Sequence, residues 1–125
     1  MRTIMVVEDN EPSRDALCRR LERRGYQVLP AVDGEEAVAM GRVRLPDLIL
    51  MDLGLPGIDG WEATRRLKSD AVTRHIPLIV LSAHAMSNDR DMALAAGGDD
   101  FDSKPIRFDQ LMVKIEALLA KGIPS

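Results

Sequence analysis

Cysteine is nearly absent from the chain, which has one among its 125 residues, together with only two histidines. The single cysteine, Cys18, cannot form a disulfide within the chain, which favours a reducing compartment and a cytoplasmic location. No second histidine or cysteine lies at metal-ligand spacing from His84. We therefore interpret His84 as a loop residue rather than a metal ligand.

Long apolar runs and an excess of positive charge are also lacking. No stretch approaches the roughly 20 apolar residues that span a bilayer. Residues 1–3 lead directly into a short apolar run without a small-residue cleavage site, so we expect neither a membrane span nor a secretory leader. Lysine and arginine total 17 against 20 aspartates and glutamates, a formal net charge of −3. This balance gives no electrostatic footprint for direct binding of nucleic acid.

The composition is otherwise ordinary for one folded domain. Hydrophobic residues make up 46% of the chain and charged residues 30%. A chain of this length can bury roughly two-thirds of its unfolded surface without metal or disulfide cross-links. No linker, low-complexity segment or internal repeat divides it, so we predict a single domain over residues 1–125.

Apolar segments alternate with helical patterns five times along the chain. The run 48–52 is apolar until Asp52 closes it, which is typical of a strand buried on both faces of a parallel sheet. Pro30 is awkward in a central strand, so its segment is predicted at or near a sheet edge. Right-handed crossovers then place helices on both faces of the sheet, which gives an α/β fold. The predicted strands are 3–7, 26–31, 48–52, 75–81 and 100–103, and the predicted helices begin near Pro12, Gly34, Trp61, Ser87 and Phe108.

The predicted helices differ in the strength of their apolar faces. The last helix has the clearest 3.6-residue pattern, formed by Phe108, Leu111, Met112, Ile115, Leu118 and Leu119. In the first helix we expect a buried face of Ala16, Leu17 and Leu21. The helix after Ser87 has a thin face, chiefly Met92, Ala93 and Ala96. We interpret this helix as a weakly held, movable element.

Polar side chains follow four of the predicted strands. Glu8 and Asp9 follow the first strand, Asp52 ends the third, Ser82 follows the fourth and Lys104 follows the fifth. The carboxyl ends of parallel strands share one edge of the sheet, so these residues are expected to converge. Three neighbouring carboxylates raise one another's pKa, and a divalent cation relieves the repulsion. Oxygen ligands suit Mg²⁺, with Mn²⁺ as the alternative, and the added ammonium and hydroxyl make a receptor for a phosphoryl group.

With these residues the chain resembles the receiver domains of two-component response regulators, such as the chemotaxis regulators, over nearly its whole length. That family carries an acidic pair after the first strand, aspartate after the third, serine or threonine after the fourth and Lys-Pro after the fifth. The segment 52–60 also resembles the family's loop after the third strand. The resemblance implies a flavodoxin-like (βα)5 three-layer sandwich, with a parallel five-stranded sheet in the order 2-1-3-4-5.

The resemblance implies roles for the acidic residues. Asp52 would accept a phosphoryl group from a phosphohistidine on a histidine kinase or a histidine phosphotransfer protein. Asp9 and Asp52 would bind Mg²⁺ directly, Glu8 would help through water, and the Gly54 backbone carbonyl would be a further ligand. The chain would thus catalyse its own aspartyl phosphorylation and dephosphorylation, and it would not be a metabolic enzyme. Gly54 and His84 are expected to tune the lifetime of the phosphoryl group.

The remaining motif residues have roles in phosphoryl binding and switching under the same resemblance. Ser82 and Lys104 would hold the phosphoryl oxygens, and Phe101 would be the aromatic switch residue. The switch would alter the surface of the fourth helix, fifth strand and fifth helix, which binds a downstream protein. The bond between Lys104 and Pro105 is expected to be cis, a form that is costly except before proline.

Two other functions match parts of the pattern. A Mg²⁺-dependent phosphatase with an aspartate nucleophile would carry a second aspartate two residues later, where this chain has Gly54. A receiver-like interaction module that is never phosphorylated stays open as an alternative. The sequence is equally compatible with a single-domain regulator and with a receiver from a hybrid kinase or a longer regulator.

Overall fold

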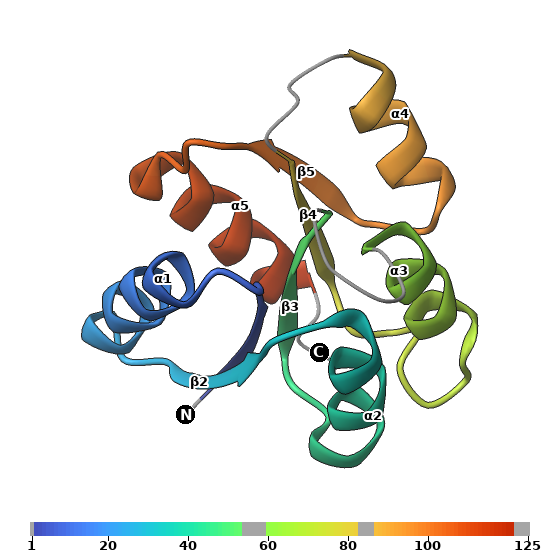
Figure 1. Cartoon of the computed structure of the whole chain (residues 1–125), viewed down its shortest axis with the longest axis horizontal. Coiled ribbons are helices and arrows are strands. Elements are labelled where there is room, and N and C mark those ends of the chain that lie inside the picture. The colour runs from blue at the N-terminus through green and yellow to red at the C-terminus, as the bar shows by residue number, and fades with distance from the viewer. Residues whose placement is uncertain (1, 54–59, 83–86, 122–125) are drawn as a thin grey trace.

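A computed structural model describes residues 2–53, 60–82 and 87–121 of the chain. Its centre is a parallel sheet of five strands in the order β2-β1-β3-β4-β5 (Figure 1). The strands are β1 (Thr3–Val7), β2 (Gln27–Ala31), β3 (Leu48–Asp52), β4 (Leu78–Ser82) and β5 (Asp100–Ser103). The predicted order is confirmed, and Pro30 lies in an edge strand, where a missing donor is tolerated.

Five helices cover the two faces of this sheet. They are α1 (Glu11–Arg23), α2 (Gly34–Arg44), α3 (Gly60–Ser69), α4 (Ser87–Ala95) and α5 (Phe108–Lys121). Helices α1 and α5 lie on one face, and α2, α3 and α4 lie on the other (Figure 1). The predicted α/β sandwich of three layers is therefore confirmed. In the described residues, no helix combines the length and apolarity needed to cross a bilayer.

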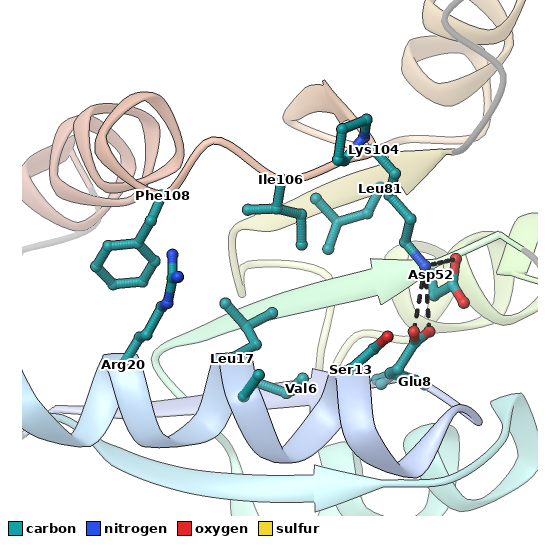
Figure 2. A pocket seen from close by; sticks show the side chains of 13 residues that line it. Val6, Glu8, Ser13, Leu17, Arg20, Asp52, Leu81, Lys104, Ile106 and Phe108 are labelled. Atoms are coloured by element: carbon teal, nitrogen blue, oxygen red, sulfur yellow. Dashed lines mark hydrogen bonds and ion pairs between the residues drawn. The ribbon is translucent and has the colours of Figure 1, made fainter.

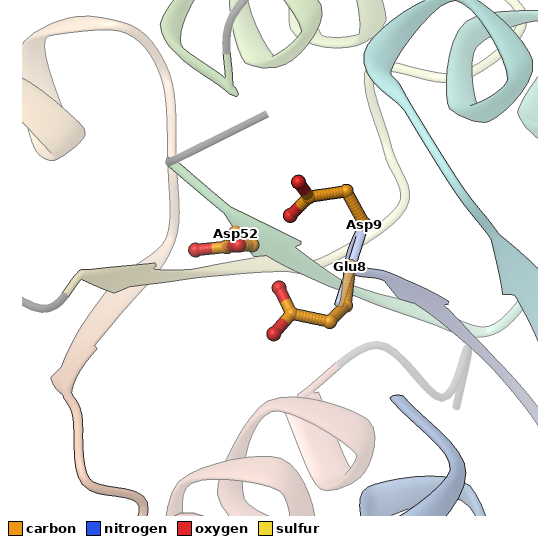
Figure 3. A group of neighbouring side chains, drawn as sticks. All are labelled: Glu8, Asp9 and Asp52. Carbon is orange, nitrogen blue, oxygen red and sulfur yellow. The ribbon is translucent and has the colours of Figure 1, made fainter. Parts of the chain in front are cut away.

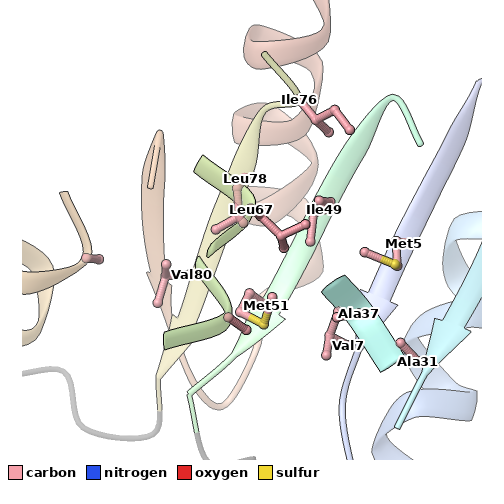
Figure 4. Packing of buried hydrophobic residues seen from close by; sticks show 12 residues of the cluster. Met5, Val7, Ala31, Ala37, Ile49, Met51, Leu67, Ile76, Leu78 and Val80 are labelled. Atoms are coloured by element: carbon pink, nitrogen blue, oxygen red, sulfur yellow. The ribbon is translucent and has the colours of Figure 1, made fainter. Parts of the chain in front are cut away.

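The central strand β3 joins two apolar cores. Its side chains alternate between the faces, so Ile49 and Met51 pack under α2 and α3 (Figure 4). Leu48 and Leu50 pack under α1 and α5 on the other face. All five residues of β3 are buried. Asp52, at its end, is thus held by a strand that cannot shift without disturbing both cores.

The start of the fourth strand differs from the prediction. Strand β4 begins at Leu78 rather than His75, because residues 70–76 are engaged in turns after α3. The amide of Thr73 donates to the Asp70 carbonyl at 3.1 Å, and the amide of Ile76 donates to the Thr73 carbonyl at 3.0 Å. Pairing with β3 starts only where Leu78 stands opposite Ile49.

Two residues that we predicted on buried helix faces are exposed. Ala16 lies on the surface of α1, since Leu17 and Leu21 are the residues that face the sheet. Met92 is 44% exposed. Among the described side chains of α4 only Ala93 is buried, and Ala96, which directly follows the helix, is buried as well. Met92 precedes Ala93, so it lies about 100° away around the helix and misses the sheet. The apolar face of α4 is thinner than predicted.

We predict that backbone amides exchange faster with solvent in α4 than in α5. Helix α5 buries Leu111, Met112, Ile115 and Leu119, and these larger side chains make local opening more costly than it is in α4. Hydrogen exchange followed by mass spectrometry or NMR should show a difference of about tenfold or more in protection. Equal protection of the Ala93 and Ile115 amides would contradict this.

Candidate functional site

Asp52 lies at the carboxyl end of β3, where it is 6% exposed. Pairing continues one residue beyond it, because the Leu53 amide donates to the Leu81 carbonyl at 3.0 Å. Gly60, the first residue of α3, packs directly on this strand end. A Cβ atom at Gly60 would collide with the Asp52 carbonyl oxygen and lie 2.8 Å from the Leu53 Cα. Only glycine allows α3 to begin here, a role that its place in a loop-like segment did not reveal.

Glu8 and Asp9 follow the adjacent strand β1. The Glu8 amide donates to the Ala31 carbonyl at 3.0 Å, and Arg14 Nη1 donates to the Glu8 carbonyl at 2.9 Å. Glu8 is therefore held in place and buried, whereas Asp9 is exposed. One carboxylate oxygen from each of Glu8, Asp9 and Asp52 lies within 4.8 Å of the others (Figure 3). The predicted convergence of three carboxylates is confirmed.

Lys104 reaches into this acidic group from the end of β5. Its Nζ lies 3.0 Å from Asp52 Oδ1 and 3.3 Å from each carboxylate oxygen of Glu8 (Figure 2). The Lys104 amide donates to the Ser82 carbonyl at 2.7 Å, which fixes the end of β5 against β4. The bond between Lys104 and Pro105 is cis, as expected.

The electrostatics of the site follow from crowding charges at a buried strand end. Burial, a hydrogen bond to Asp52 and repulsion by Asp52 together raise the pKa of Glu8 to about 7, although Lys104 acts in the opposite direction. Burial alone would lower the pKa of Lys104, but Asp52 and Glu8 outweigh it and raise that pKa. Lys104 therefore stays charged at neutral pH, and the acidic group still attracts either a proton or a further cation.

The other predicted residues have different relations to this group. Ser82 ends β4 and is 3% exposed, one residue beyond Leu81, which stands opposite Asp52 in the register. Phe101 is half-buried and packs against the core under α2, α3 and α4. Gly54 and His84 lie outside the described residues.

A cavity of about 290 Å³ opens beside the side chains of Glu8, Asp52 and Lys104, between α1 and the start of α5. It runs from Glu8, Asp52 and Lys104 to Arg20 and Phe108 (Figure 2). At its far end, the guanidinium carbon of Arg20 lies 5.5 Å from the centroid of the Phe108 ring. Its walls include the apolar side chains of Val6, Leu17, Leu81 and Ile106. Asp52 therefore has an apolar wall on its α1 side, which the sequence pattern did not indicate.

The chemistry of the site is set by its donor atoms. Three carboxylates that can approach a common point match the preference of a hard divalent cation for oxygen ligands. An ammonium group beside the Asp52 carboxylate supplies the charge needed to hold a phosphoryl group. The residues thus fit both Mg²⁺ and a phosphoryl group.

A family model described as the response regulator receiver domain matches residues 4–116. The chain belongs to this family. It is 37% identical over 120 residues to protein PilH of Pseudomonas aeruginosa, covering 96% of this chain and 99% of PilH. It is also 38% identical over 123 residues to the phosphate regulon transcriptional regulatory protein PhoB of Escherichia coli, and it spans about half the length (54%) of that relative.

Solved receiver structures share the fold. A putative response regulator from Chloroflexus aurantiacus superposes with a TM-score of 0.91 at 30% identity, covering 95% of this chain and 98% of that one. The receiver domain of a sensor histidine kinase from Pseudomonas aeruginosa superposes with a TM-score of 0.88 at 34% identity, with the same coverage. That structure is described with a magnesium ion coordinated in its active-site cleft. The chain is thus a receiver domain, not a metabolic enzyme, and its acidic group resembles the phosphorylation site of this family.

Glu8 predicts a pH dependence of folding stability in metal-free buffer. Its pKa rises from the ordinary 4.5 to about 7 on folding, so the folded state binds the proton more tightly than the unfolded state does. The stabilisation is fully present below about pH 4.5 and is lost as the pH rises through 7, by up to about 3 kcal/mol.

Urea denaturation with a chelator present, from pH 4.5 to 8, would measure this effect as the difference between wild type and Glu8→Gln. We expect the relative stability of the wild type to fall across this window, since Glu8→Gln cannot ionise. Lys104 is charged throughout the window and adds no slope. A constant difference, or one that rises with pH, would contradict the assignment.

Proposed function

We propose that this domain accepts a phosphoryl group on Asp52 from a histidine kinase or a histidine phosphotransfer protein. The observation that carries the proposal is the position of Lys104 Nζ, 3.0 Å from Asp52 Oδ1 beside the acidic group. Relatives among regulators and a kinase receiver domain support a phosphohistidine donor. The proposed setting is the cytoplasm, with no direct binding of nucleic acid by this domain.

The transfer forms one bond and breaks one. A carboxylate oxygen of Asp52 attacks the phosphorus, the bond between phosphorus and the donor's imidazole nitrogen breaks, and the electron pair stays on that nitrogen. Lys104 and Ser82 hold the phosphoryl oxygens as charge develops on them. Attack of water on the resulting acyl phosphate later returns Asp52 and releases inorganic phosphate.

The acidic group also suits a bound cation. Asp9 and Asp52 would hold Mg²⁺ directly and Glu8 through water, with Mn²⁺ as the alternative ion. The proposed further ligand, the Gly54 carbonyl, lies outside the described residues. When bound, the cation neutralises charge on the carboxylates and the phosphoryl oxygens. The kinase receiver domain with magnesium in its cleft supports this assignment.

Phosphorylation would then be transmitted to a downstream protein. The phosphoryl oxygens attract the Ser82 hydroxyl, and Phe101 rotates into the space that Ser82 leaves. The altered surface is formed by α4, β5 and α5. Met92 on α4 and Val113 on α5 are 44% and 69% exposed, which supports an apolar contact there. Gly54 and His84 are proposed to tune the lifetime of the phosphoryl group.

Incubation with acetyl phosphate and Mg²⁺ tests the proposal directly. We expect intact-protein mass spectrometry to show a gain of one phosphoryl group, which is lost in Asp52→Asn and when a chelator removes the cation. Asp109→Asn, a substitution at an exposed position of α5, serves as the matched control and should be labelled like the wild type. No mass gain in the wild type would instead favour the interaction module that is never phosphorylated.

Lys104→Met should slow labelling of Asp52 while leaving cation binding intact. Loss of one charged group that contacts the transferred oxygens typically costs about 100- to 1,000-fold in rate. Mg²⁺ affinity should be kept or increased, because a competing positive charge is removed from Asp52 and Glu8. Labelling time courses and calorimetric Mg²⁺ titration would measure both, with the exposed Lys121→Met as control. Unchanged labelling of Lys104→Met would exclude the role of this lysine.

A further inference from the structure

Strand β5 contains a buried carboxylate that the phosphorylation site does not use. Asp102 is 7% exposed and stands opposite Leu81, a member of the core under α1 and α5. Its Oδ1 accepts a hydrogen bond from the Ser103 amide at 2.9 Å. Its Oδ2 is shielded from solvent and has no hydrogen-bond partner among the residues that the structure describes. A buried oxygen of this kind is costly and calls for a physical explanation.

Lys114 on α5 is the cation nearest to this carboxylate in the described part of the chain, but it favours another partner. Its Nζ donates to the Phe101 carbonyl at 2.6 Å and lies 3.5 Å from Asp102 Oδ1. The lysine thus holds the backbone of the proposed switch residue, and the adjacent carboxylate is left under-paired. A small movement of Nζ away from Phe101 would complete the ion pair.

We propose that Lys114 exchanges the Phe101 carbonyl for the Asp102 carboxylate when the domain becomes phosphorylated. In the resting state Lys114 ties β5 to α5, and in the phosphorylated state it neutralises Asp102 and releases the Phe101 backbone. Lys114 and Asp102 are positioning residues, because they act on the strand that carries Phe101 and Lys104. The proposal rests on the phosphorylation of Asp52 and adds the element with two arrangements that responds to it.

The two arrangements make Asp102→Asn a discriminating variant. Asparagine keeps the shape and the oxygen that accepts from the Ser103 amide, but it removes the charge that attracts Lys114 in the phosphorylated state. The buried charge whose Oδ2 has no partner in the described residues also disappears, while Lys114 keeps its bond to the Phe101 carbonyl, so the resting protein should be as stable as the wild type or more stable. Phosphorylation should become slower, because its rate scales with the fraction of protein in the competent state. A merely structural role would lower stability and labelling together.

The test compares acetyl phosphate labelling and urea denaturation in wild type, Asp102→Asn and the exposed control Glu116→Gln. We expect Asp102→Asn to be labelled about three- to tenfold more slowly than the wild type, with unchanged or higher stability. This change in rate corresponds to the net contribution of one hydrogen bond to the population of the competent state. Glu116→Gln should match the wild type. Adding Lys114→Met to Asp102→Asn removes the resting hold without stranding a buried charge, so labelling should recover toward the wild-type rate.

Several results would overturn the exchange. They are labelling of Asp102→Asn at the wild-type rate, a joint fall of its stability and labelling, and a double variant slower than Asp102→Asn. Absence of labelling in the wild type would instead remove the proposed function itself, and the exchange with it.

Discussion

Mutual repulsion among three carboxylates is the constraint on which this structure depends. Glu8, Asp9 and Asp52 can stay close only because the sheet fixes β1 and β3 side by side and Lys104 offsets part of the negative charge. Two apolar cores resist the separation that the charges favour. Burial first, and then the neighbouring Asp52, raise the pKa of Glu8, so Lys104 does not fully offset the cost of holding these charges together. The group therefore keeps a negative charge that a bound cation or the proposed phosphoryl transfer would change directly.

Much of the fold and the site could be predicted from the sequence because both depend on simple patterns. The buried run before Asp52 indicated a central strand, and parallel topology then brought the strand ends together. The errors arose where the rotation of a helix about its axis decides which side chains are buried, or where local turns decide where a strand begins. Ala16 and Met92 are apolar residues just off the buried face of their helices, and turns before Leu78 delay the fourth strand. No residue type by itself signals these details.

Other features need coordinates because they depend on distances across the chain. Gly60 looked like the last residue of a loop, yet it is where α3 meets the backbone of Asp52. Asp102 looked like one more acid in a polar strand, yet it is buried beside an apolar core with a lysine that bonds elsewhere. Both lie close to residues that the motif does contain. The family pattern therefore locates the chemistry, and the surrounding contacts show how this chain supports it.

The charged groups beside Asp52 come from different strands, so they meet only when the whole sheet is assembled. A misfolded copy, or one that lacks a strand, therefore loses this charged site together with the fold. Under the proposed function, such copies would take no phosphoryl groups from a donor and would not compete with intact molecules. The parallel topology would in this way confine the proposed response to correctly folded molecules.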